Sequence, residues 1–438
     1  MENSGISLLD LLLSISDTVD IISPELNGHH KRVTYISQAI AKEMGITLEE
    51  RRDLFLASLL HDCGSMSLKE RLDSLEFDMV NPHKHAQIGY QLLKDFKPLE
   101  RPAVIIMYHH TDWYFEYGTS SGLNSSDNLL ENSAENSNYI NINGEIPVES
   151  RILNLADRVD VLIDKKKEVL GQVAGIRKKI LEESGRKFMP EVVYAFLKVS
   201  EPESFWLDII NIEKFGGNTM RNTEYDIILE EKNMYEAAEI FKRLIDFRSN
   251  FTAAHSSGVA AVAEVLGHYV GLKEKDVNVL KIAGYLHDLG KLAVPTEILE
   301  KPAQLTKEEV NIMKIHPYYT YKILSRVEGL KEICETAAFH HERLNGKGYP
   351  FNMKGEDLSL TARILAVADI FTAITEDRPY RKAMDPEMSL RVMEKMVMNQ
   401  SIDKNIFLIL KEKYYSINSV RMEAQNEEVN VYKKFIQI

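Results

Sequence analysis

This chain of 438 residues is poor in cysteine and carries fewer basic than acidic residues. Its two cysteines, Cys63 and Cys334, exclude a disulfide framework and favour a reducing compartment, so we expect the cytoplasm. Lys and Arg number 53 against 66 Asp and Glu, which gives a formal net charge of -13. A broad polynucleotide-binding surface needs clustered basic residues, and we expect none. A small anionic ligand needs only a local basic pocket.

Long apolar runs are missing as well. The most apolar stretch, Ile6 to Ile22, is interrupted by Asp10, Asp17 and Asp20, whereas a membrane span requires roughly 20 consecutive apolar residues. We predict that this stretch is a docking helix and that the chain has no membrane segment. The overall composition, 44% hydrophobic and 27% charged, is that of a globular protein too long for one core.

Apolar residues recur at intervals of three and four through most of the chain. One such series is Val259, Val262, Leu266 and Val270, which is the spacing of one face of an α-helix. No segment shows the sustained alternation of a half-buried strand. We therefore predict an all-α fold.

The chain also contains one long, diverged duplication. His29 and His255 are 226 positions apart, and so are the HD pairs that begin at His61 and His287. Further matches follow at slightly different offsets, as expected for repeated domains. The matched residues are His29 with His255, His61 and Asp62 with His287 and Asp288, His85 with His316, His109 and His110 with His340 and His341, and Asp157 with Asp369.

The duplication predicts two helical domains in tandem, residues 1–215 and 235–438. The copies differ most between the His pair and the final Asp, where the first copy has an insertion rich in Asn and Ser. We expect this insertion, residues 118–145, to be a surface loop.

The repeated His and Asp residues are candidate metal ligands. His287 and Asp288 follow the apolar run 279–286, so both are expected to be buried, where a metal ion would satisfy them. A single buried His is more often a hydrogen-bonded core residue, but recurrence of the whole set in both halves favours metal. Mixed nitrogen and oxygen donors favour iron, manganese or zinc over magnesium or calcium.

Four motifs in the second half carry a family resemblance. They are FRSNFTAAHSSGV around His255, HDLGK from His287, HHERLNGKGYP from His340 and DRPYR from Asp377. Over about residues 240–420 the chain resembles an HD-GYP phosphodiesterase domain, and the first half more weakly resembles a plain HD domain. The resemblance implies hydrolysis of a cyclic dinucleotide, chiefly cyclic di-GMP and in some members 3′,3′-cyclic GMP-AMP.

The resemblance also implies a site. Two divalent ions, iron or manganese, would be held with Asp288 as the bridge, and Asp288 and Lys291 would be the catalytic residues. The implied metal ligands are His255, His287, Asp288 and Asp369 for one ion, and His316, His340 and His341 for the other. The implied substrate contacts are Lys291, Arg378, Arg381, Gly346, Gly348 and Tyr349. The GYP turn would shape the groove or receive a protein partner, and we also consider a homodimer.

Three positions depart from the family pattern. Phe251 replaces a Glu found in members with a third metal, which favours two ions here. Asn345 and Thr372 replace two Asp residues, and we expect these changes to remove negative charge near the site. That loss leaves a non-catalytic nucleotide sensor or adaptor as the alternative.

The first repeat keeps enough residues for a second metal site. These are Glu25, His29, His61, Asp62, His85, His109, His110 and Asp157. Ser65 occupies the position of Lys291, and the GYP turn is absent. We therefore favour a regulatory role for this domain, with a second active site as the rival interpretation.

Overall fold

The structure, a computed structural model, describes residues 5–20, 26–65, 67–78, 83–114, 146–212, 223–247, 254–377 and 381–436. It is built almost entirely from helices, which confirms the all-α prediction. The one sheet within these ranges is a two-residue antiparallel pair. Glu25, Phe251, Arg378 and the insertion at 118–145 lie outside the described residues.

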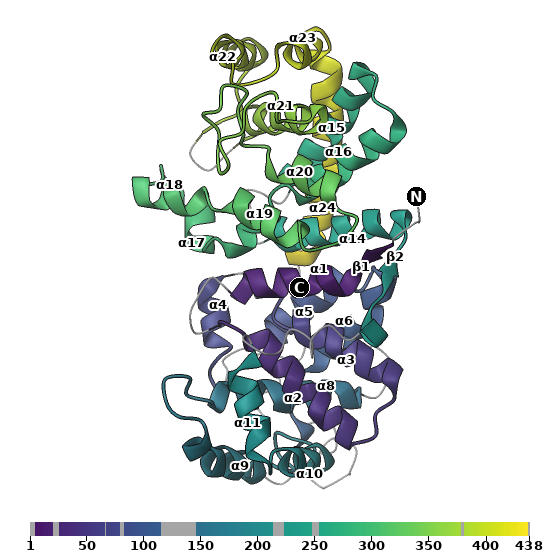
Figure 1. Cartoon of the computed structure of the whole chain (residues 1–438), viewed down its shortest axis with the longest axis vertical. Coiled ribbons are helices and arrows are strands. Elements are labelled where there is room, and N and C mark those ends of the chain that lie inside the picture. The colour runs from purple at the N-terminus through teal and green to yellow at the C-terminus, as the bar shows by residue number, and fades with distance from the viewer. Residues whose placement is uncertain are drawn as a thin grey trace, which may run out of the picture.

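Two lobes are stacked along the long axis of the molecule (Figure 1). The first half of the chain forms β1 Ile6–Ser7, α1 Leu8–Asp20, α2 His29–Glu43, α3 Leu48–Leu60, α4 Leu68–Asp73, α5 His83–Leu93, η1 Lys97–Leu99, α6 Glu100–Tyr108, α8 Val148–Leu162, η3 Leu170–Gln172, α9 Val173–Glu182, α10 Pro190–Val199 and α11 Glu203–Ile210. The remainder forms η4 Thr223–Tyr225, β2 Ile228–Leu229, α14 Glu231–Asp246, α15 His255–Val270, α16 Glu274–Leu286, η5 Leu289–Ala293, α17 Thr296–Leu299, α18 Lys307–Met313, α19 His316–Leu324, α20 Lys331–Ala338, α21 Leu360–Thr375, α22 Pro386–Met398, α23 Lys404–Glu412 and α24 Tyr414–Ile436.

The predicted docking helix forms α1, which lies where the two lobes meet (Figure 1). It packs against α3 of the first lobe and against α19 and η5 of the second. Its leucines Leu8, Leu11 and Leu12 are fully buried, which explains why this helix is apolar on most of its surface. None of the helices in the described ranges is long and apolar enough to cross a membrane. One hydrophobic cluster runs through both lobes, so a shared core joins them.

The internal repeat extends further than the sequence comparison indicated, because α1 and α14 are equivalent helices. Asp20 and Asp246 are 226 positions apart, and each ends its helix. Asp20 Oδ1 lies 2.5 Å from His30 Nδ1, and Asp246 Oδ1 accepts a hydrogen bond of 2.8 Å from Ser256 Oγ. Each helix also packs against the opposite lobe, α1 on α19 and α14 on α5. The two halves thus meet through matching helices.

A close contact between η5 and α19 positions the HD pair of the second lobe. A Cβ on Gly290 would lie 1.9 Å from the carbonyl oxygen of His316, so only glycine fits there. Gly290 N donates to Thr320 Oγ1 at 2.9 Å, and Thr320 Oγ1 donates to the carbonyl oxygen of His287 at 2.9 Å. These contacts hold His287 and His316 side by side. Gly64 approaches the carbonyl oxygen of His85 in the same way in the first lobe.

Candidate metal centres

The second lobe brings the seven predicted metal ligands together. Helix ends supply most of them. His255 begins α15, His287 and Asp288 follow α16, His316 begins α19, His340 and His341 follow α20, and Asp369 lies within α21. All except His341 are buried, and His341 is partly buried.

Two groups of three residues each offer ligand atoms within 4.8 Å of one another. The groups are His255, His287 and Asp288, and His316, His340 and His341. The Asp288 carboxylate lies between them, with Oδ2 3.2 Å from His287 Nε2 and Oδ1 3.3 Å from His316 Nε2. One oxygen therefore faces each group, which is the placement of a bridging ligand.

Asp369 spans the same two groups from the opposite helix. Its Oδ1 lies 3.3 Å from His255 Nε2, and its Oδ2 lies 3.9 Å from His341 Nδ1. The centre therefore has two carboxylates that both reach from one group to the other. This donor set of five imidazoles and two carboxylates suits two transition-metal ions.

Three of the imidazoles are oriented by the backbone. In each, Nδ1 donates 2.7 Å to the carbonyl oxygen three residues earlier: His287 to Gly284, His316 to Met313 and His340 to Ala337. A carbonyl oxygen only accepts, so Nδ1 carries the hydrogen and Nε2 keeps its lone pair. His287 Nε2 is buried and makes no hydrogen bond within the described residues. Such a nitrogen requires a partner, and a divalent ion fits that requirement.

The protonation states in the centre match those of metal ligands. Burial lowers the pKa of His316 to about 4 and that of His340 to about 3. Burial by itself would raise the pKa of the Asp288 carboxyl, but His287 and Lys291 outweigh it and hold this pKa well below its usual value. At neutral pH the imidazoles of His316 and His340 are therefore neutral and the Asp288 carboxylate is ionised, as metal binding requires.

Lys291 and Arg381, two residues predicted to contact phosphate, lie in different surroundings. Lys291 Nζ lies 2.5 Å from Asp288 Oδ2, directly at the centre. Arg381 donates to the carbonyl oxygens of Ala373 at 2.5 Å and Ile374 at 3.4 Å, at the end of α21. Lys291 is thus part of the centre, whereas the described contacts of Arg381 stabilise a helix end.

The GYP turn lies directly on the ligand pair. Gly348 approaches the preceding chain so closely that a Cβ would lie 2.4 Å from Glu342 Cα and from Arg343 N. Glu342 itself is buried, and its two carboxylate oxygens accept from the backbone N–H groups of Phe351 at 2.7 Å and Met353 at 3.0 Å. Glu342 was not among the predicted site residues. Its position directly after the His pair is the only sequence signal that could have indicated it.

The predicted groove residue Tyr349 reaches the centre. Its ring centroid lies 4.8 Å from that of the metal-ligand candidate His341, with the planes at 34°. The third predicted residue of the turn, Gly346, adopts a φ of 72°, which favours glycine. The turn therefore forms one wall beside His341.

The described hydrogen bonds of the Asn345 side chain are with Asn399, Ser401 and Lys347. Its Nδ2 donates to the carbonyl oxygen of Asn399 at 2.7 Å, and its Oδ1 accepts from Lys347 N at 3.0 Å. The Asn399 contact joins the turn to the connection between α22 and α23. An ionised aspartate cannot donate this hydrogen bond, which gives a structural reason for asparagine at this position.

The expectation that Thr372 leaves the site short of negative charge is wrong. Glu376, which follows α21, lies 2.9 Å from His255 Nδ1 through Oε1. A carboxylate is therefore present beside the first ligand, one helical turn beyond Thr372. Sequence reasoning missed it because an acidic residue just after a helix usually lies in solvent.

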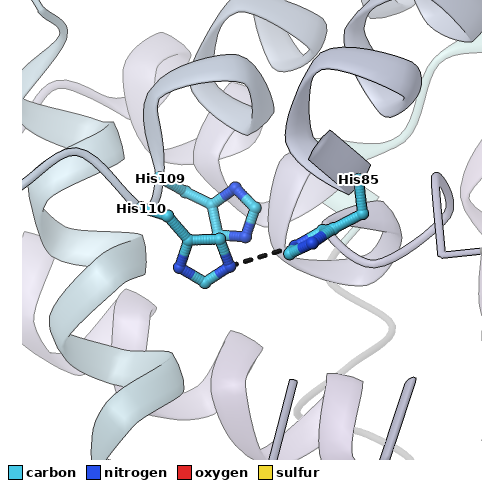
Figure 2. Close-up of side chains that lie close together, drawn as sticks. All are labelled: His85, His109 and His110. Carbon is cyan, nitrogen blue, oxygen red and sulfur yellow. Dashed lines mark hydrogen bonds between the residues drawn. The ribbon is translucent and has the colours of Figure 1, made fainter. Parts of the chain in front are cut away.

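The first lobe assembles the equivalent residues into a similar centre. The groups are His29, His61 and Asp157, and His85, His109 and His110. Figure 2 shows the second group, in which His110 Nε2 lies 3.0 Å from His85 Nε2. Asp62 Oδ1 lies 3.4 Å from His85 Nε2, and its Oδ2 lies 3.8 Å from His29 Nε2. Asp62 therefore lies between two groups, as Asp288 does.

Comparisons with known proteins agree with this architecture. HD domain family models match residues 27–162 and 239–406. The chain is 29% identical over 426 residues to 3′3′-cGAMP-specific phosphodiesterase 1 of Vibrio cholerae, covering 94% of each chain. It is 38% identical over 162 residues to the cyclic di-GMP phosphodiesterase response regulator RpfG of Xanthomonas campestris, covering 36% of this chain and 43% of that protein.

A solved structure shares the fold. The crystal structure of a cyclic GMP-AMP specific phosphodiesterase from V. cholerae superposes with a TM-score of 0.61 at 23% identity, covering 94% of this chain and 98% of the other. The chain therefore belongs to the HD domain family and carries two HD domains in tandem, the second of the HD-GYP type.

Proposed function

We propose that this chain is a metal-dependent phosphodiesterase that hydrolyses a cyclic dinucleotide, with catalysis in the second domain. The observation that carries the proposal is the pair of ligand groups spanned by Asp288 and Asp369. Two ions held by these residues would suit the cleavage of phosphate esters. The first domain, which we delimit as residues 1–215 ahead of a catalytic domain at 235–438, would be regulatory.

The substrate class follows from the relatives. The V. cholerae protein that matches over 94% of both chains is specific for 3′3′-cGAMP, and the relative from X. campestris acts on cyclic di-GMP. Cyclic di-GMP and 3′,3′-cyclic GMP-AMP each contain two phosphodiester linkages of the same kind. The motifs favour cyclic di-GMP, and the match over 94% of both chains makes 3′,3′-cyclic GMP-AMP an equal candidate.

The chain's own residues have distinct tasks in this proposal. Bound ions would lower the pKa of a water nucleophile and stabilise the negative charge that develops on the phosphate. His287, His316 and His340 present fixed Nε2 lone pairs. Lys291 adds a cation beside the bridging carboxylate, where it can contact a phosphate. Arg381 uses two contacts to hold α21, and we propose that its remaining N–H donors, with Arg378, face the second phosphate.

Metal identity, location and partners complete the proposal. We propose iron or manganese, as the family resemblance implies; imidazole and carboxylate donors suit both ions. The scarcity of cysteine fits the cytoplasm. The GYP turn remains the proposed contact for a protein partner, and a homodimer remains a prediction.

The test is turnover by purified protein loaded with Fe(II) or Mn(II), assayed with both cyclic dinucleotides. Asp288→Ala should abolish formation of the linear product, while the matched change Asp62→Ala in the first domain should leave turnover unchanged. Equal turnover in Asp288→Ala and the unchanged protein would refute the assignment.

The alternative of a non-catalytic sensor rested on Asn345 and Thr372. Asn345 is bonded to the backbone of Asn399, and the carboxylate absent at Thr372 is replaced by Glu376. Neither departure therefore argues for an inactive centre. Tight binding of a dinucleotide without product over hours would nevertheless favour the sensor.

A further inference from the structure

Glu376, which is not one of the predicted ligands, contacts the Nδ1 atom of His255. Its Oε1 lies 2.9 Å from His255 Nδ1, while His255 Nε2 lies 3.3 Å from Asp369 Oδ1. The imidazole is thus held between two carboxylates. Since an ionised carboxylate only accepts, His255 Nδ1 carries the hydrogen, and Nε2 presents its lone pair toward Asp369 and the ligand group.

The described contact of His255 Nδ1 differs in kind from those of three other ligand candidates. The imidazoles of His287, His316 and His340 are each fixed by the carbonyl oxygen three residues earlier. His255 is the first residue of α15, and its Nδ1 contacts the side chain of Glu376. Glu376 therefore helps to fix the orientation of the His255 ring.

In the first domain, an aspartate contacts the equivalent histidine nitrogen. His29, the equivalent of His255, lies 2.7 Å through Nδ1 from Asp160 Oδ2. Asp160 is three residues after Asp157, a position that Thr372 occupies in the second domain. Thr372 Oγ1 is buried and makes no hydrogen bond within the described residues. The carboxylate has thus moved about one helical turn along the helix and still reaches the same imidazole nitrogen.

A second side chain holds Glu376 in place from outside. Glu376 Oε2 accepts a hydrogen bond of 2.8 Å from Gln425 Nε2, on α24. Gln425 in turn accepts from the guanidinium of Arg421, which is buried. The C-terminal helix α24 packs along α15. It therefore connects to the ligand group through two side chains.

We propose that Glu376, held by Gln425, is the positioning residue of His255 and a determinant of metal affinity in the second domain. The proposal rests on the metal centre of the proposed function. A hydrogen-bonded partner of this kind fixes the tautomer and the ring plane of a ligating histidine and raises its basicity. Loss of such a partner typically weakens metal binding by roughly 10- to 100-fold.

The experiment measures Mn(II) binding by the full-length chain, without substrate. Free Mn(II) is followed by its EPR signal during titration of the metal-free protein. All variants carry Asp62→Ala, so that binding in the first domain is reduced equally. Glu376→Gln, which keeps the size and removes the charge, should weaken the tight Mn(II) site by roughly 10- to 100-fold. Glu427→Gln, an exposed change on α24, should leave it unchanged.

Rescue distinguishes positioning from a general structural effect. The double change Glu376→Gln with Thr372→Asp places the carboxylate where the first domain has Asp160, and it should restore most of the affinity. Unchanged affinity in Glu376→Gln would overturn the proposal, and so would equal weakening in the single and double variants. If the unchanged protein hydrolyses a dinucleotide while Glu376→Gln binds Mn(II) normally, this inference fails and the proposed function stands. If no variant binds Mn(II), the proposed metal centre itself fails.

Discussion

Arg158 donates a hydrogen bond of 2.6 Å to Oδ2 of Asp157, the first-domain equivalent of Asp369. Both side chains are buried, at 3% and 2% exposure. The same guanidinium donates to the carbonyl oxygen of Ser74 at 2.8 Å. Oδ1 of Asp157 remains directed toward His29, 3.6 Å from Nε2. A fixed cation thus occupies one oxygen of a candidate ligand and leaves the other facing the centre.

The second domain places its cation differently. Ile370 stands at the position of Arg158, and Lys291 instead contacts Asp288. The first domain has Ser65 at the position of Lys291. The cation therefore pairs with a different carboxylate in each centre, Asp157 in the first domain and Asp288 in the second. This difference argues against identical phosphate recognition by the two domains.

Arg158→Met tests whether the first domain takes an ion at Asp157. Removing one partner of a buried ion pair leaves an uncompensated charge, so the metal-free protein should lose about 3–5 kcal/mol of unfolding free energy. Excess Mn(II) should recover part of this loss, because an ion can neutralise Asp157. Urea denaturation in chelator and in Mn(II) measures both. Arg391→Met, which breaks an exposed pair with Glu387, should change stability by about 0.5 kcal/mol or less. The same deficit with and without Mn(II) would argue against a first-domain site.

Gly348→Ala tests the dependence of turnover on the GYP turn. The added Cβ would meet backbone atoms of Glu342 and Arg343 at 2.4 Å, so the turn has to move away from the neighbouring His341. Displacement of a site by about 1 Å can reduce rate roughly 100-fold, and we expect a comparable fall in kcat/KM. Gly175→Ala is the matched control, since its Cβ would meet no atom within 4 Å. Unaltered kcat/KM in Gly348→Ala would show that the turn does not shape the site.

The fold and most of the ligand set are readable in the sequence because helical periodicity and repeated His and Asp residues survive divergence. The equivalence of α1 and α14 cannot be read from the sequence. Asp20 and Asp246 occupy matching positions, but they contact different residue types, His30 and Ser256. The contact of Glu376 with His255 could not be predicted from the sequence either. Its function depends on the end of α21 lying beside the start of α15, and no spacing along the chain encodes that proximity.

Asn345→Asp tests the interpretation that this position supports the turn rather than selects the substrate. The change removes the donor to the carbonyl oxygen of Asn399, which should lower the unfolding free energy by about 1 kcal/mol. The ratio of kcat/KM for the two dinucleotides should stay the same, because the described hydrogen bonds of the Asn345 side chain are with Asn399, Ser401 and Lys347 and none is with a ligand candidate. Parallel denaturation and kinetics check both, with the exposed Asn426→Asp as control. A changed ratio would make Asn345 a specificity residue.

The two cysteines should react at very different rates with a thiol reagent. Cys334 is 2% exposed, and burial raises the pKa of its thiol to about 12. Because only the thiolate reacts, about one Cys334 in ten thousand is reactive at pH 8, and the fraction rises about tenfold with each pH unit. Cys63 is partly buried at the junction of the lobes, beside Val19 and Leu292. Iodoacetamide followed by peptide mass spectrometry should therefore find Cys63 modified first. In a Cys63→Ser variant, modification should require denaturant, and rapid labelling of native Cys334 would contradict the buried placement of α20.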